Sequence, residues 1–179
     1  MNEAAPAIGI VQDGDGADVQ RLFRGFVQRW KAKARIVGVI EEGDGEGLQP
    51  RNARHLVSVL DGARFRIFQD LGPGSTACQI DPDSLASAGE AVRRHIEMGC
   101  DLVILSKFAR LEAERRGGLM PALVSAAEAG IPLLTSVGGK FDAAWHQFAE
   151  NNYASLSPDQ PALEHWWHKV RGSARPQRI

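Results

Sequence analysis

The sequence predicts an α/β protein of three layers, in which helices cover both faces of a mainly parallel sheet that carries a β-hairpin insertion. Short apolar runs, typical of buried strands, alternate along the chain with amphipathic segments typical of helices. Strands that alternate with helices pair in parallel through right-handed crossovers. Near the middle of the chain, Asp61-Gly62 separates two further strand-like runs, which is the signal of an antiparallel hairpin.

The first half of the chain predicts a β-α-β unit followed by the hairpin. Apolar residues spaced by three and four positions predict a helix over residues 17–33, which Asp15 or Asp18 could cap. The acidic, glycine-rich segment 41–49 predicts a loop, and Asp61-Gly62 predicts a type I′ turn. The strands of this half are expected at residues 7–11, 36–40, 55–60 and 64–69.

The second half predicts further helices and strands that extend the parallel sheet. Asp83 or Ser84 could cap a helix that runs to Met98, with Gly99 at its carboxyl end. The other helices are expected at residues 118–129, 141–151 and 161–170, and the strands at 101–105 and 131–135. Parallel strands end at one edge of the sheet, where open sheets of this kind bind their ligands.

Length and composition indicate one ordinary globular domain. The chain has 179 residues, so we expect a single domain over residues 1–171 and a disordered tail over 172–179. The 21 basic and 22 acidic residues give no bulk attraction to nucleic acid or to an anionic membrane. No signal peptide or membrane-spanning run is present, and the two cysteines have no metal-ligand spacing. We therefore expect a soluble, cytoplasmic protein that binds neither nucleic acid nor membrane.

The glycine-rich turn after the first strand is the natural place for a phosphate-binding loop. A P-loop has the pattern GxxxxGK[ST], whose lysine neutralises the phosphates and whose hydroxyl holds magnesium. Here no lysine, serine or threonine follows Gly16, and three aspartates bring negative charge that opposes a phosphate. Either the turn is structural, or it binds a small ligand or a cation at the helix N-terminus. The residues that would contact the ligand are Asp13, Gly14, Asp15 and Gly16.

The loop after the strand at residues 101–105 reverses the charges of a P-loop enzyme. Such enzymes have a magnesium-binding aspartate there, often followed by a catalytic glutamate, whereas this chain has Ser106 and Lys107. Lys107 either occupies the anion site with its own charge or forms an ion pair with Asp13 or Asp15. In both cases the charges of the two loops are exchanged, which argues against ordinary magnesium-dependent phosphate transfer.

Further along the same loop, arginines could form an anion-binding rim, because guanidinium groups suit oxyanions. The alternative is a solvated loop, in which Glu112 pairs with Arg110 or Arg115. The candidate ligand-binding residues of this region are Ser106, Lys107, Arg110, Glu112 and Arg115. No residue pattern assigns a catalytic group, a metal site or a particular cofactor. Trp145, Trp166 and Trp167 are expected to cover the sheet edge or to fill a subunit contact.

Three stretches resemble a bacterial domain family of unknown function whose genes often lie near those for molybdate uptake or nitrogenase. They read C-Q-I-D-P at 78–82, L-S-K-F-A-R-L-E-A-E at 105–114 and A-G-I-P-L-L-T-S-V at 129–137, and the resemblance extends from Ala7 to about Trp167. More distantly, the layout is similar to the THEP-type nucleoside-triphosphatases, which have the P-loop NTPase fold and a hairpin after the second strand. That similarity places Ser106, Lys107 and Glu112 where those enzymes have acidic residues.

These observations leave three hypotheses about function. The first is a non-catalytic or regulatory protein with a degenerate P-loop-type cleft, which binds a small oxyanion such as molybdate. The second is a divergent nucleoside-triphosphatase or nucleotide-binding transferase. The third is an interaction module with a vestigial cleft. The expected partner is a small anionic ligand or a nucleotide, with homo-oligomerisation left open.

Overall fold

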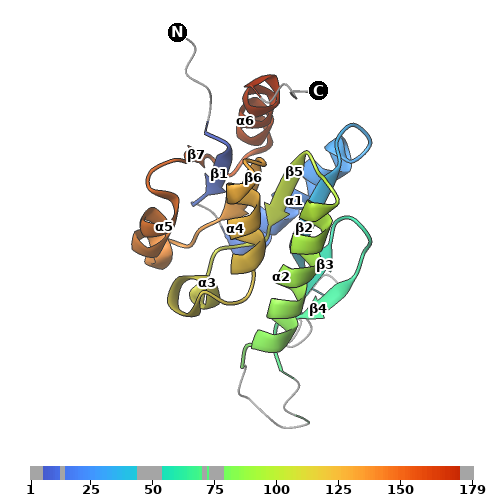
Figure 1. Cartoon of the computed structure of the whole chain (residues 1–179), viewed down its shortest axis with the longest axis vertical. Coiled ribbons are helices and arrows are strands. Elements are labelled where there is room, and N and C mark those ends of the chain that lie inside the picture. Colours follow the sequence, from blue (N-terminus) through green and yellow to red (C-terminus); the bar gives the residue numbers. More distant parts are fainter. Residues whose placement is uncertain (1–5, 13–14, 44–53, 70–71, 73–78, 174–179) are drawn as a thin grey trace.

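The computed structural model describes residues 6–12, 15–43, 54–69, 72 and 79–173 of the chain. Its strands are β1 (Ile8–Val11), β2 (Ile36–Gly43), β3 (Arg54–Ser58), β4 (Arg64–Arg66), β5 (Leu102–Leu105), β6 (Leu133–Ser136) and β7 (Ala154–Leu156). They form one seven-stranded sheet in the order β4-β3-β2-β5-β6-β1-β7 (Figure 1). The β2–β3 and β3–β4 pairs are antiparallel and the other four pairs are parallel, which confirms a mainly parallel sheet with a hairpin insertion.

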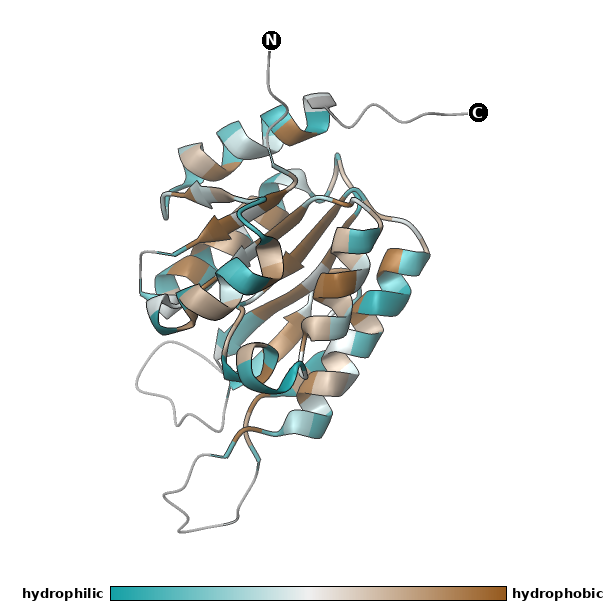
Figure 2. Cartoon of the chain, turned by 60° about the vertical axis from the view of Figure 1, so that its left-hand side comes forward, coloured by the Kyte–Doolittle hydropathy of each residue, from teal (hydrophilic) through white to brown (hydrophobic). Residues whose placement is uncertain are grey.

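Helices cover both faces of this sheet, as the sequence predicted. They are α1 (Gly16–Trp30), α2 (Pro82–Glu97), α3 (Arg110–Arg115), α4 (Met120–Glu128), α5 (Asp142–Ala149) and α6 (Gln160–Ser173), with a 3-10 helix, η2, at Gly139–Phe141. α1 and α6 pack with Leu102 and Ile104 on one face, whereas α2, α4 and α5 pack with Val103 and Leu105 on the other. The apolar strands therefore lie between two layers of amphipathic helices (Figure 2).

Several elements begin or end at residues other than those predicted. α1 ends at Trp30, three residues early, and Asp15 is its cap because Asp15 Oδ1 accepts a hydrogen bond from Ala17 N at 2.9 Å. α2 is capped by Asp81 and not by Asp83 or Ser84, since Asp81 Oδ1 accepts from Ser84 N at 3.0 Å. Pro82 occupies the first turn, where its missing N–H costs no hydrogen bond.

One predicted loop and one predicted turn also differ from the structure. Residues 41–43 continue β2 and are not loop, while residues 44–49 lie outside the described residues. The hairpin turn is not of type I′, because that type needs a positive φ at both central residues and only Gly62 has one, at 75°. Ser58 N instead donates to Ala63 O, and Ala63 N donates to Asp61 Oδ1.

α3, β7 and the last residues of α6 were not predicted. α3 forms within the segment expected to be an arginine-bearing loop, and β7 adds an edge strand after α5. α6 continues over Gly172 and Ser173, the first residues of the predicted tail, whereas 174–179 lie outside the described residues. Pieces of three to six residues have too few positions to display a hydrophobic period.

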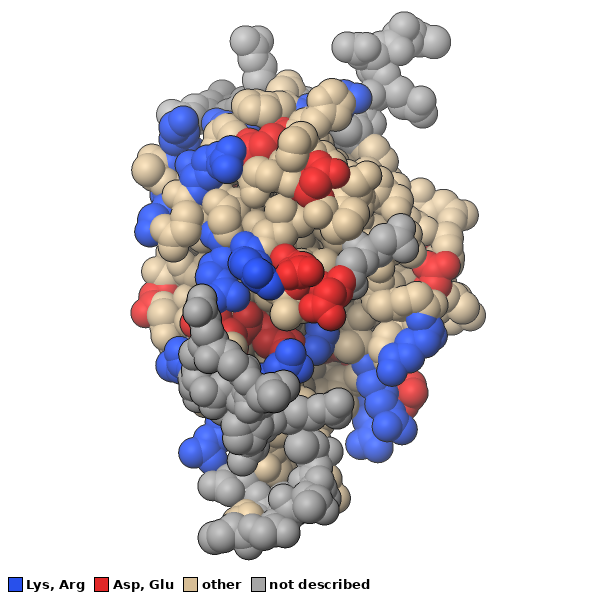
Figure 3. All heavy atoms as spheres, turned by 180° about the vertical axis from the view of Figure 1, so that it is seen from behind, with Lys and Arg blue, Asp and Glu red and all other residues tan. Residues whose placement is uncertain are grey.

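The tryptophans belong to the core of the chain. Trp145, Trp166 and Trp167 are 0%, 3% and 1% exposed, so the expectation that they form a subunit contact is wrong. Seen from behind, basic and acidic side chains lie beside one another near the middle of the face, and much of the remaining surface is uncharged (Figure 3). Within the part of the chain that the structure describes, no helix is long and apolar enough to cross a membrane.

Candidate functional site

A cleft of about 640 Å³ opens at the carboxyl ends of β1, β5 and β6. Its floor is formed by the residues that follow these strands, by Gly16 at the start of α1 and by the segment that leads into η2. Its far wall is apolar and comes from the hairpin and the start of α2. Lining side chains of this wall are Leu56, Ile67, Phe68, Ile80 and Leu85. The cleft therefore lies where the parallel sheet predicted a ligand site.

Ser106 lines the cleft and has a buried hydroxyl group without a partner among the described residues. The residue is 1% exposed, and its Oγ has no hydrogen-bond partner among the described residues. Its carbonyl oxygen is occupied, because it accepts from Gln20 Nε2 and from Ser136 Oγ, both at 2.8 Å. A buried hydroxyl without a partner costs free energy, so a ligand atom that bonds to it would recover that cost.

Gln20 fixes the relative position of two strand ends. Its side chain is 5% exposed and reaches from α1, donating to Ser106 O after β5 and accepting from Glu41 N in β2 at 2.9 Å. The amide group thus satisfies one buried backbone acceptor and one buried backbone donor. This contact holds α1, β2 and β5 together beneath the cleft.

Glu41, at the end of β2, neutralises the lysine of the β5 loop. Its carboxylate is 7% exposed and lies 2.9 Å from Lys107 Nζ and 3.1 Å from Arg54 Nε. Lys107 therefore pairs with Glu41 and not with Asp15, while Asp13 lies outside the described residues. From the sequence, this lysine was expected either in the anion site or beside an aspartate of the first loop. In the structure its charge is balanced by the carboxylate of Glu41 in β2.

Glu112 is buried in the wall of the cleft and holds two backbone groups. Its Oε2 accepts from Ala109 N at 3.0 Å and its Oε1 accepts from Leu119 N at 2.9 Å. It is 4% exposed and pairs with neither arginine considered for it: Arg110 bonds to Glu114 at 2.9 Å. The carboxylate thus connects the start of α3 to the start of α4.

Gly118 is required by this arrangement. Its φ is 59°, and a Cβ at this position would lie 2.4 Å from Glu112 Oε1. A side chain here would both strain the backbone and displace the carboxylate. The second glycine of the G-G pair after the arginines is thus part of the Glu112 contact.

The two described residues of the first loop differ in their relation to the cleft. Gly16 lines it, whereas Asp15 is exposed and caps α1. Asp13 and Gly14 lie outside the described residues. Of the β5 loop, Ser106, Lys107, Arg110 and Glu112 line the cleft, while Arg115 is exposed on α3 outside it.

Sequence reasoning missed three polar residues of the cleft: Gln12, Ser136 and Lys140. Gln12 Nε2 donates to Asp142 Oδ1 at 2.5 Å, and Gln12 Oε1 accepts from Ser155 Oγ at 3.0 Å. Lys140 is exposed, lies 5.1 Å from the ring of Phe141 and forms no ion pair within the described chain. The G-G-K triplet at 138–140, one residue after the strand at 133–136, was the signal that could have identified it.

The net result is that the buried carboxylates in and beside the cleft already have partners. Glu41 is balanced by two cations and Glu112 by two backbone N–H groups. Among the described side chains of the cleft, the Ser106 hydroxyl and the Lys140 ammonium remain for a ligand. Among the described residues, no three histidine, cysteine or acidic side chains are grouped so that they could hold a metal ion.

Comparison with known proteins gives one family and one fold. Residues 8–166 match the family described as "Protein of unknown function (DUF2478)". The chain is 34% identical over 165 residues to the "Molybdenum import ATP-binding protein ModC 2" of Bradyrhizobium diazoefficiens. That match covers 90% of this chain but 18% of the relative, so the chain spans about a fifth of that protein's length.

The fold is similar to that of a solved human protein described as a cancer-related nucleoside triphosphatase. The TM-score is 0.55 at 15% sequence identity, and the similarity covers 98% of this chain and 100% of the other. At this identity the similarity shows the fold alone. It confirms the P-loop NTPase type of sheet that the THEP-type resemblance implied.

Proposed function

The chain belongs to the DUF2478 family, and from this premise we propose that it is a non-catalytic, regulatory binding domain for a tetrahedral oxyanion group. The group is either a free oxyanion, such as molybdate, or the phosphate of a nucleotide. Both present negatively charged oxygens of tetrahedral geometry, which the same donors can bind.

One observation carries the proposal: the cleft keeps a buried donor and a cation, while its carboxylates are satisfied internally. The Ser106 hydroxyl is 1% exposed and has no partner among the described residues. Lys140 lines the same cleft without a carboxylate partner within the described chain. A ligand with anionic oxygens suits both groups, whereas a cation would be repelled by Lys140.

The geometry supports binding better than hydrolysis. Ser106 and Lys107 follow β5 where a hydrolase has its acidic pair, and Lys107 is paired with Glu41. Glu112 is the remaining carboxylate in the wall, but both of its oxygens accept backbone hydrogen bonds. A carboxylate in that role cannot leave its partners to activate a water molecule without leaving two N–H groups unpaired.

Two sources of the oxyanion are supported by different observations. Free molybdate is suggested by the name of the ModC 2 relative, to which most of this chain is similar. A nucleotide is suggested by the cleft itself, because 640 Å³ and an apolar wall exceed what a bare tetrahedral ion fills. The proposal concerns the shared oxyanion chemistry, and the experiment separates the two sources.

Thermal denaturation in the presence of molybdate, tungstate, sulfate, phosphate and ATP, with and without magnesium, tests the proposal. A ligand at a hundred times its dissociation constant raises the stability by about 2.7 kcal/mol, which shifts the midpoint by several degrees. We expect such a shift with molybdate or with ATP, each without a need for magnesium.

Variants show whether the shift arises in this cleft. Lys140→Ala and Ser106→Ala should each reduce it, and Lys31→Ala, an exposed lysine that does not line the cleft, should leave it unchanged. If molybdate shifts the midpoint and ATP does not, the ligand is a free oxyanion. If ATP shifts it and molybdate does not, the ligand is a nucleotide. Magnesium-dependent release of phosphate from ATP, or no shift with any of these anions, would contradict the proposal.

A further inference from the structure

Lys140, the cation that the proposed function assigns to the cleft, lies on a short connection between two elements. Residues 137–141 link the end of β6 to the start of α5, partly as η2. We call this segment the β6–α5 connection. Gly138 and Phe141, on either side of Lys140, also line the cleft. Whatever holds this connection therefore determines where the Lys140 ammonium can reach.

The end of β1 holds the connection at both of its ends. At the start of the connection, Val137 N donates to Val11 O at 3.0 Å. Directly after it, Gln12 Nε2 donates to Asp142 Oδ1 at 2.5 Å. Val11 is the last residue of β1 and Gln12 follows it, so two consecutive residues bond to the two ends of the connection.

Between these two bonds the connection gains little from packing. Gly138 and Gly139 are exposed, and a Cβ at Gly139 would meet nothing within 4 Å. Phe141 is partly buried against the core, and Lys140 Nζ lies 5.1 Å from the centroid of its ring. Because the two glycines add no side-chain contacts, the bond from Gln12 matters for the orientation of the whole segment.

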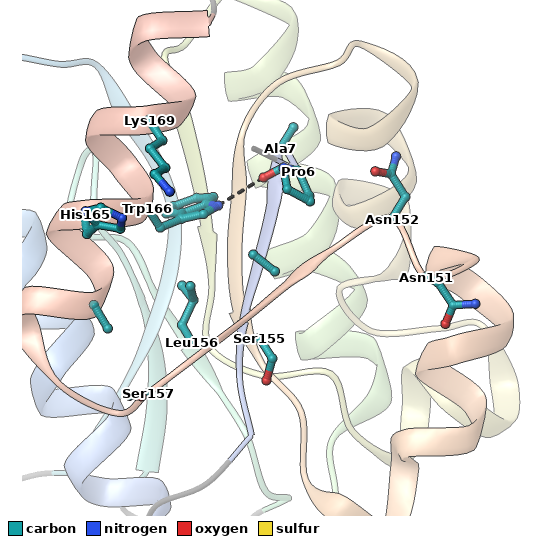
Figure 4. A pocket seen from close by; sticks show the side chains of 12 residues that line it. Pro6, Ala7, Asn151, Asn152, Ser155, Leu156, Ser157, His165, Trp166 and Lys169 are labelled. Carbon is teal, nitrogen blue, oxygen red and sulfur yellow. Dashed lines mark hydrogen bonds between the residues drawn. The ribbon is translucent and has the colours of Figure 1, made fainter. Parts of the chain in front are cut away.

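Gln12 is itself held in one orientation by the edge strand of the sheet. Ser155 lies on β7 beside β1 (Figure 4), and its Oγ donates to Gln12 Oε1 at 3.0 Å. Only the NH2 group of a glutamine can donate to a carboxylate, so the amide nitrogen faces Asp142 and the amide oxygen faces Ser155. The other oxygen of Asp142 lies 3.7 Å from His146 Nε2, one turn along α5.

We propose that Gln12 and Asp142 are positioning residues for the oxyanion group: their hydrogen bond holds the β6–α5 connection so that the Lys140 ammonium stays at the cleft. This role rests on the proposed function, which assigns Lys140 to the anion. The cation is then in place before the ligand arrives, so less ordering free energy is lost on binding.

Limited proteolysis of the ligand-free protein tests whether the bond holds the connection. Trypsin cleaves after exposed lysines, and Lys140 is exposed. Gln12→Met keeps the size of the side chain but removes its hydrogen bonds, and should raise the rate of cleavage after Lys140 about fivefold. Gln147→Met, the same change at an exposed position of α5 outside the cleft, should leave that rate unchanged. Cleavage after Lys31, at the end of α1, is the internal control.

Two substitutions of Asp142 separate positioning from simple electrostatics. Asp142→Ala and Asp142→Asn both remove a negative charge, so electrostatics alone predicts that both raise the affinity for an anion. Asparagine can still accept from Gln12 Nε2 through its side-chain oxygen, whereas alanine cannot. We therefore expect Asp142→Ala to lower the affinity for molybdate or ATP about fivefold, and Asp142→Asn to keep or raise it. Thermal shifts over a range of molybdate and of ATP concentrations measure these affinities.

Two results would overturn the inference. Unchanged cleavage after Lys140 in Gln12→Met would show that the hydrogen bond does not hold the connection. A higher anion affinity in Asp142→Ala would show that the aspartate acts through its charge alone. If neither anion shifts the midpoint of the wild type, the proposed function is wrong and the positioning role falls with it, whereas the cleavage rates still show whether Gln12 holds the connection.

Discussion

Glu41 and Glu112 are both buried carboxylates at the carboxyl edge of the sheet, but they are satisfied by different partners. Glu41 is 7% exposed and bonds to two side-chain cations, Lys107 and Arg54, each more than 40% exposed. Glu112 is 4% exposed and bonds only to buried or half-buried backbone N–H groups. The partners of Glu41 can turn to solvent if it is lost, whereas those of Glu112 cannot.

Glu112→Gln should have the largest effect on stability. The glutamine can present one oxygen, so its NH2 group would face the N–H of Ala109 or of Leu119 and leave it unpaired. We expect a loss of about 3 kcal/mol, since the lost bond is charge-assisted and the N–H stays buried. Urea denaturation measures this, with Glu114→Gln on the exposed side of α3 as the matched control. A loss of unfolding free energy below about 1 kcal/mol would show that Glu112 depends on its partners no more than Glu41 does.

Gly118→Ala should have the second largest effect. The added Cβ meets Glu112 Oε1 at 2.4 Å in a backbone conformation that alanine disfavours, so we expect a loss of about 2 kcal/mol. In the Glu112→Gln background the loss should be smaller, because the carboxylate contact is already disturbed. Full additivity of the two losses would show that Gly118 acts independently of Glu112.

Glu41→Gln should cost about 1 kcal/mol, because the two cations that it releases are partly exposed and can be hydrated. It should also raise the affinity of the cleft for an oxyanion, since Lys107 lines the cleft and is then unpaired. Thermal shifts with molybdate and with ATP measure this gain. Unchanged affinity in Glu41→Gln, together with a normal shift in the wild type, would show that Lys107 does not reach the ligand.

Ser106→Ala should have the smallest effect on the ligand-free protein. The hydroxyl has no hydrogen-bond partner among the described residues, so its removal costs no internal bond and leaves stability unchanged or slightly higher. Urea denaturation without ligand checks this. A clear loss of stability would mean that the hydroxyl is structural, as Glu112 is, and is not reserved for a ligand.

The sequence predicted the layers, the parallel sheet and the hairpin, because these depend on local periodicity. The runs at 36–40 and 101–105 are apolar enough to fix two strands, and the spacing in 17–33 fixes α1. The cap of α2 could have been predicted, since Asp81 precedes a proline in the position typical of a helix start. The single domain over 1–171, the cytoplasmic location and a homo-oligomer stay predictions.

The partners within the site could not be predicted, because they depend on which strand ends are neighbours. Lys107 and Glu41 are 66 residues apart, and their contact follows from β2 lying beside β5. An arginine partner was one alternative for Glu112, but in the structure its carboxylate accepts from the backbone N–H groups of Ala109 and Leu119. The ligand site as a whole stays a prediction. Its residues are Asp13, Gly14, Asp15, Gly16, Ser106, Lys107, Arg110, Glu112 and Arg115.

The placement of Trp145 gives the cleft a fluorophore of its own. Trp145 contacts Phe108, a cleft residue, with ring centroids 5.1 Å apart, whereas the other three tryptophans pack on the opposite face of the sheet. Indole emission depends on the polarity and packing around the ring, so occupation of the cleft should alter the emission of Trp145. Replacing Trp145 by phenylalanine would remove that change, and ligand binding could be followed in unlabelled protein.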